Sequence, residues 1–185
     1  MPIPAFDHNY VLPPHLGSPT NNNHLSPYLA TTVELVQRFG TSSERIQILN
    51  GLLNFRVELQ QYGLINGFQW LDGSFLEDIE IQENRPPRDL DLVTMFWGYD
   101  LTFQHGLVQQ IPEFANSNLS KKNYMLDHYG VDAGLDPSIT IELTRYWVQL
   151  FSHNRNKVWK GMIKIALNTP NEDALAIQSL QNLQP

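Results

Sequence analysis

Segments with strand-like composition alternate with helix-like segments along most of the chain, and this alternation limits the possible folds more than any other feature. Four short stretches are expected to form strands: residues 67–71, 89–96, 131–135 and 162–167. Helical patterns lie between and around them, over about 30–39, 41–62, 117–128 and 139–150, and after Pro170. This intermixing predicts one domain of the α+β or α/β class.

Local signals mark several of the predicted helix ends. Thr41 stands three residues before Glu44, the spacing of a capping box that opens a helix. Gly63 follows that helix, where a left-handed cap commonly ends one. Thr169 and Glu172 repeat the capping-box spacing, with Pro170 at the first helical position. The last of these signals predicts a separate amphipathic helix within residues 168–185.

The first 30 residues differ from the rest of the chain. They hold six of the twelve prolines and only one charged side chain, Asp7. Proline disfavours helix at the residue before it, which predicts an extended segment. Phe6, Tyr10, Val11 and Leu12 are large apolar groups that a floppy tail would rarely carry. We therefore expect a Pro-rich arm at 1–30 packed on a domain at 31–167, with a floppy tail as the alternative.

Composition excludes several classes of function. The formal net charge of −7 argues against a broad electrostatic surface for duplex DNA. The absence of cysteine excludes thiol catalysis and cysteine-ligated zinc. No apolar run approaches the about 18 residues of a membrane-spanning helix, and the first basic residue is Arg38, unlike a signal peptide. These features predict a cytoplasmic protein without a membrane partner.

Two short motifs carry the chemistry. Gly73-Ser74 directly follows an apolar strand, where a glycine lets a phosphate approach the backbone amides and the serine adds a hydroxyl. Asp89-Leu90-Asp91 opens the next strand, so both carboxylates face the same side about 6–7 Å apart. Carboxylate oxygens suit hard divalent ions such as Mg²⁺. Each motif alone also has an ordinary explanation, a turn for the first and a solvated strand edge for the second.

The combination of strand, Gly-Ser, loop and Asp-x-Asp strand resembles the DNA polymerase β-type nucleotidyltransferase superfamily. The resemblance implies a minimal α+β domain with a mixed or antiparallel sheet flanked by helices. It also implies that Gly73 and Ser74 hold the triphosphate and that Asp89 and Asp91 ligate Mg²⁺ or Mn²⁺. A third catalytic and metal-binding carboxylate is expected on a later strand, for which Asp132 is the candidate. Asp127, expected in a helix, and Asp136, which precedes Pro137, are its competitors.

The wider sequence, through Arg85-Pro86-Pro87-Arg88 and Tyr146-Trp147 to Lys160-Gly161, resembles small uncharacterised bacterial proteins of nucleotidyltransferase type. Cationic side chains are expected near the phosphates, and Arg88, Arg155 and Lys160 are the candidates. Arg88 could instead pair with the acidic loop, and Lys160 could be a solvated strand start.

The resulting hypothesis is metal-dependent transfer of a nucleotidyl group from a nucleoside triphosphate (NTP) to RNA, a protein or a small molecule. The alternative is a binding module or antitoxin-type regulator without turnover, which contacts a protein partner through its arm or its last helix.

Overall fold

The computed structural model describes residues 3–183 and has the α+β fold class expected from the sequence. Its centre is one mixed sheet of five strands in the order β1-β5-β2-β3-β4. β2 is antiparallel to both of its neighbours, whereas β1 pairs with β5 and β3 pairs with β4 in parallel. The strand bounds are β1 Tyr28–Leu29, β2 Gly67–Asp72, β3 Leu90–Phe96, β4 Leu126–Asp132 and β5 Ile163–Ala166.

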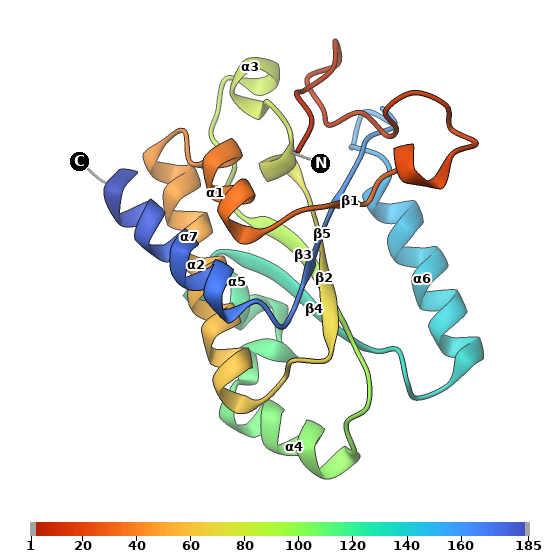
Figure 1. Cartoon of the computed structure of the whole chain (residues 1–185), viewed down its shortest axis with the longest axis vertical. Helices are drawn as coiled ribbons and strands as arrows, with labels where there is room; N and C mark the ends of the chain where they lie inside the picture. The colour runs from red at the N-terminus through yellow and green to blue at the C-terminus, as the bar shows by residue number, and fades with distance from the viewer. Residues whose placement is uncertain (1–2, 184–185) are drawn as a thin grey trace.

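Helices cover the sheet unequally on its two sides. Figure 1 shows α1, α2 and α7 stacked on one side, with α6 standing alone on the other. The seven α-helices of residues 3–183 are α1 Thr32–Phe39, α2 Ser43–Tyr62, α3 Ile79–Glu83, α4 Leu101–Gln110, α5 Ser117–Tyr124, α6 Pro137–Phe151 and α7 Pro170–Leu183. The same residues also form three short 3₁₀ helices: η1 Asn22–His24, η2 Ser74–Leu76 and η3 Pro112–Phe114. None of these helices has the length and apolarity needed to cross a membrane.

Successive side chains along each strand point to opposite faces of the sheet, and each face carries its own hydrophobic core. The larger core lies under α1, α2 and α7 and takes Leu71, Leu92 and Ile165 from the sheet. The smaller core lies under α6, where Trp147 and Phe151 pack on strand residues of the opposite parity. Those strand residues are Trp70, Val93, Met95 and Val131. Because α6 covers this face alone, part of the face stays open, and the candidate site lies there.

Helix α2 ends as its sequence predicts and begins one residue later than expected. Gly63 adopts the left-handed conformation, with φ of 100°, and its N–H donates to the Leu59 and Gln60 carbonyls. At the other end the N-cap is Ser42, whose hydroxyl accepts from the Arg45 N–H at 3.3 Å. The capping box expected at Thr41 is therefore wrong, because the neighbouring serine already satisfies the free helical amide.

Residues 3–27 lie along the domain with η1 as their only helix. Val11 and Leu12 are fully buried, and the Leu12 carbonyl accepts a hydrogen bond of 2.7 Å from the Gly161 N–H. Phe6 is partly buried. Tyr10 was also expected to be buried, but its side chain is 43% exposed because it sits in a turn with φ of 61°.

The segment between α5 and β4 differs most from expectation. The helix predicted over 117–128 ends at Tyr124, because Met125 takes a left-handed conformation with φ of 59° and caps it. The strand expected at 131–135 shares only residues 131 and 132 with the observed strand β4, which runs from Leu126 to Asp132 and pairs with β3 along its whole length. Asp127, expected in a helix, is therefore a strand residue.

Candidate functional site

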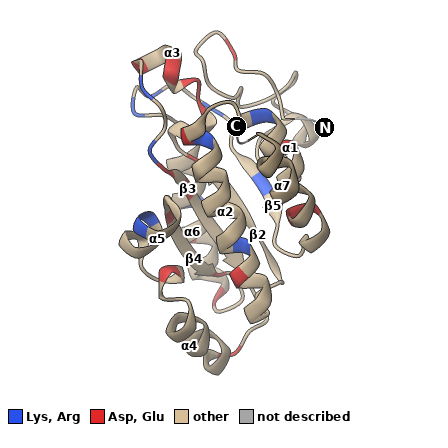
Figure 2. Cartoon of the chain, turned by 90° about the vertical axis from the view of Figure 1, so that its left-hand side faces the viewer, with Lys and Arg blue, Asp and Glu red and all other residues tan. Residues whose placement is uncertain are grey.

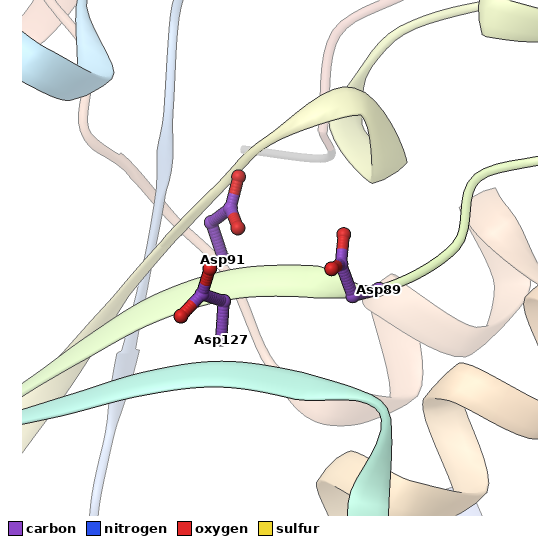
Figure 3. Close-up of side chains that lie close together, drawn as sticks. All are labelled: Asp89, Asp91 and Asp127. Carbon is purple, nitrogen blue, oxygen red and sulfur yellow. The ribbon is translucent and has the colours of Figure 1, made fainter. Parts of the chain in front are cut away.

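Three carboxylates converge where β3 and β4 begin. Asp91 and Asp127 are register partners across the parallel β3–β4 pair, and Asp89 precedes β3 on the same face. Figure 3 shows the three side chains rising from the two neighbouring strands toward a common space. An oxygen atom from each carboxylate lies within 4.8 Å of an oxygen atom of the other two. The expected Asp89–Asp91 pair is therefore close together, with Asp127 as its third member.

Asp132 does not belong to this cluster, and the expectation for it is wrong. It is the register partner of Phe96, five residues beyond the Asp91–Asp127 pair, which is about 16 Å along the strand. An odd number of residues also places it on the other face of the sheet. Its carboxylate accepts hydrogen bonds from Gln104 Nε2 at 2.7 Å and from the Gly134 N–H at 2.9 Å. Asp136, the other competitor, caps the start of α6.

The Gly-Ser turn lies directly beside the cluster. Gly73 has φ of 84°, a conformation that favours glycine, and a Cβ at this position would collide with the Asp91 carboxylate. The turn leads from β2 into η2, which begins at Ser74. Gly73, Ser74 and the three aspartates all line one cleft. The sequence therefore predicted correctly that these two motifs share a site.

Lys160 contacts the Gly73-Ser74 turn from the protein interior. Its side chain is only 2% exposed, and its ammonium donates to the Gly73 carbonyl at 3.1 Å and to Glu77 Oε1 at 2.7 Å. Asp72 Oδ1 lies 3.0 Å away on a third side. Burial lowers the pKa of Lys160, but Asp72 and Glu77 outweigh it and raise that pKa overall. These three partners occupy the ammonium, so the expected direct contact with phosphate is replaced by an internal role.

The site carries more negative charge than its own cations neutralise. Asp72, Asp91 and Asp127 are register neighbours across β2, β3 and β4. Burial raises the pKa of Asp91 to about 6, helped by the charges of Asp89 and Asp127. Burial likewise raises the pKa of Asp72 to about 7, although Lys160 opposes the shift. A cation entering the cluster would relieve this repulsion.

Lys121, from α5, already supplies one positive charge at the cluster. Its ammonium lies 2.9 Å from Asp89 Oδ2 and 3.0 Å from Asp127 Oδ2, bridging the two carboxylates. Hydrogen bonds to Asp89 and Asp127 raise the pKa of Lys121 despite partial desolvation. Sequence reasoning missed this residue, because the helix predicted over 117–128 placed Lys121 and Asp127 on one element instead of on α5 and β4. Lys121 shows that the carboxylates accept a shared cation.

The remaining cations differ in their relation to the cleft. Arg155 lines it, as expected, and so does Arg85, which sequence reasoning left out. Arg88 is exposed and lies outside the residues that line the cleft, so the expectation for it is not met. On the side of α1, α2 and α7, drawn in Figure 2, the Lys and Arg positions are scattered along the ribbon among acidic residues.

The cleft encloses about 500 Å³ and has two unlike ends. Carboxylates, the Gly-Ser turn and the arginines form the polar end. At the other end, Trp147 of α6 packs against Tyr129 of β4 and against Tyr146 of its own helix. The volume is in the range of small-molecule sites, which favours a ligand with both an anionic part and a flat apolar part.

Comparison with protein families identifies a match over residues 4–166, to a family described as one of unknown function. The chain belongs to the DUF6932 family. The matched range includes both motifs, the Asp89–Asp91–Asp127 cluster and the aromatic end of the cleft. Neither the curated proteins nor the solved structures contain a match to this DUF6932 member.

Proposed function

We propose that the cleft catalyses Mg²⁺-dependent nucleotidyl transfer from an NTP to a hydroxyl acceptor. The observation that carries the proposal is the convergence of Asp89, Asp91 and Asp127 beside the Gly73-Ser74 turn. Strand, Gly-Ser turn, Asp-x-Asp strand and a third carboxylate on a later strand are the features by which the sequence resembles the polymerase β-type superfamily. Asp127, on β4, supplies the third carboxylate in that order.

The donor set suits Mg²⁺ or Mn²⁺. Hard divalent ions take carboxylate oxygens together with substrate phosphate oxygens, and the three aspartates face open space in the cleft. Burial raises the pKa of Asp91, and the charges of Asp89 and Asp127 add to the shift; a divalent ion would offset that added repulsion. Asp89, Asp91 and Asp127 would hold the metal. Bound metal would lower the pKa of the acceptor hydroxyl and neutralise charge on the leaving pyrophosphate.

The chain's own residues bind and orient the reactants. The Gly73 backbone and the Ser74 hydroxyl hold the terminal phosphates, and Arg155 and Arg85 add positive charge along the cleft. The acceptor oxygen forms a bond to the α-phosphorus as the bond from that phosphorus to the β-phosphate oxygen breaks. Pyrophosphate leaves with the electron pair, and we assign the acceptor's proton to the Asp127 carboxylate.

The charge of the protein and the size of the cleft limit the acceptors that fit the proposal. A net charge of −7 disfavours a long duplex, which needs a broad basic surface. A small molecule, a protein side chain or an RNA end could instead reach the cleft alone. An RNA end presents only a few phosphates, so it demands little of the surface beyond the cleft.

The test is metal-dependent labelling. Wild type, the double variant Asp89→Asn/Asp91→Asn and the control Asp132→Asn are each incubated with labelled NTPs, Mg²⁺ or Mn²⁺ and a cell extract. The proposal predicts label transfer by wild type and the control, and a loss of at least about 100-fold in the double variant, because the ion contributes several kcal/mol to the transition state. Circular dichroism checks that the fold persists.

Two outcomes would contradict the proposal. Full transfer by the double variant would show that these carboxylates are not the catalytic ones. Nucleotide binding by wild type without any transfer would favour the alternative function, a nucleotide-binding regulator that acts on a protein partner.

A further inference from the structure

The aromatic end of the cleft has a feature that a packed core lacks. Tyr129 and Tyr146 line the cleft but remain 44% and 50% exposed. Trp147 lies behind them, 6% exposed, with its ring centroid 5.1 Å from each tyrosine ring. The buried tryptophan therefore supports two tyrosine rings that leave much of their surface uncovered. Such rings can stack on a flat ligand without first rearranging.

The position of this aromatic wall relative to the carboxylates is set by β4. Tyr129 follows Asp127 by two residues, so the two side chains leave the same face of the strand about 6–7 Å apart. A nucleotide separates its α-phosphate from its base by a sugar, a span of similar size. A ligand with its phosphates at the aspartates therefore places its base near Tyr129.

We propose that Tyr129 and Tyr146, supported by Trp147, stack against the base of the bound nucleotide. This inference rests on the proposed nucleotidyl transfer and adds the part of the site that recognises the base. Stacking on an aromatic ring is tolerant of base identity, because every base presents a flat π-face. The wall therefore accepts a nucleoside triphosphate and distinguishes it from a bare polyphosphate.

The experiment compares two ligands by isothermal titration calorimetry with Mg²⁺: the NTP that wild type binds most tightly, and inorganic tripolyphosphate. We expect wild type to bind the NTP more tightly than tripolyphosphate. Tyr146→Leu and Tyr129→Leu should weaken NTP binding by about 10- to 100-fold, the range of one base–aromatic stack, and leave tripolyphosphate binding unchanged. Tyr146→Phe, which keeps the ring, should bind NTP like wild type.

The same titrations include a control variant, and three outcomes would contradict the proposal. Trp97→Leu removes a ring that is 43% exposed but lies outside the residues lining the cleft, and should change neither affinity. Unchanged NTP binding in both leucine variants would overturn the aromatic wall and leave nucleotidyl transfer standing. Equal weakening of both ligands would assign the tyrosines to the fold of the cleft. Failure of wild type to bind either ligand would overturn both proposals.

Discussion

Replacing Lys160 with methionine removes the positive charge that holds the Gly-Ser turn. The ammonium is 2% exposed and contacts Asp72, Glu77 and the Gly73 carbonyl at 2.7–3.1 Å. Without it, the buried carboxylates of Asp72 and Glu77 lose their shared cation, and the Gly73 carbonyl keeps only the Leu76 N–H as a donor. Removing one partner of a buried ion pair costs about 3–5 kcal/mol, a large part of the about 5–15 kcal/mol that stabilises a domain. We expect a loss of unfolding free energy of that size at pH 8.

The pH dependence of this loss has a definite sign. Asp72 has a pKa of about 7 in the folded protein, above its ordinary value of 3.8, and loss of Lys160 removes an influence that lowers it. A group whose pKa is higher in the folded state stabilises the fold when protonated, and this stability is lost as pH rises through the folded pKa. The Lys160→Met variant should therefore regain stability as pH falls from 8 to 5.

Urea denaturation followed by circular dichroism at pH 8 and pH 5 measures both effects. Lys122→Met, which removes an exposed lysine from α5, serves as the matched control and should change stability little. An unchanged unfolding free energy in Lys160→Met, combined with weakened nucleotide binding, would refute the internal role. That result would return Lys160 to the phosphate contact expected from sequence.

Three further perturbations test other parts of the structure. Gly73→Ala should lower the melting temperature and abolish metal binding, because its Cβ meets Asp91 and because its backbone, with φ of 84° and ψ of −173°, lies in a region that costs other residues about 1–3 kcal/mol; normal Mn²⁺ binding would contradict this. Deleting residues 1–14 should lower the melting temperature, since Val11 and Leu12 are fully buried and each contributes about 1.5–3 kcal/mol; an identical melting curve would favour a floppy tail. Lys121→Gln should tighten Mn²⁺ binding roughly 2- to 10-fold by removing two partly exposed ion pairs that compete with the metal; weaker binding would show that Lys121 organises the site instead.

Much of the site could be predicted from local sequence patterns. The alternation of side chains along a strand correctly placed Asp89 and Asp91 together. The resemblance to the nucleotidyltransferase superfamily implied that Gly73 lies beside them, as it does. Gly63 was also correct as a helix cap, because glycine adopts positive φ without a steric penalty. The predictions of the Asp89–Asp91 pair and of the Gly63 cap both depend on residues close together in sequence.

The wrong predictions concern the boundary between α5 and β4 and the role of Lys160, where no neighbouring residue in the sequence indicated the structure. Met125 ends α5 in a left-handed conformation that methionine rarely adopts, so no glycine marked the boundary and Asp127 was left in a helix. The alternation of Leu126, Asp127 and His128 was the signal that could have revealed β4. Lys160 was misjudged for another reason. Its partner Glu77 lies 83 residues away, a contact that only the folded chain creates.

The same difficulty applies to the aromatic end of the cleft. Tyr129 lies on β4 and Trp147 on α6, and their contact depends on how α6 crosses the open face of the sheet. Tyrosine and tryptophan are also common core residues, so their identity alone does not indicate a binding surface. Their exposure inside the cleft supplies the information that the sequence lacks.

The central claim is that Asp89, Asp91 and Asp127 form one metal site. Electron paramagnetic resonance of Mn²⁺, titrated into wild type, Asp127→Asn and Asp132→Asn, tests it most directly. Both variants remove one carboxylate from the same strand and keep its shape, but only Asp127 belongs to the cluster. The account predicts that Asp127→Asn weakens Mn²⁺ binding at least about 10-fold, because loss of even a hydrogen-bonding partner of a metal ligand costs about 10- to 100-fold, while Asp132→Asn binds like wild type. Wild-type affinity in Asp127→Asn, or an equal loss in both variants, would contradict it.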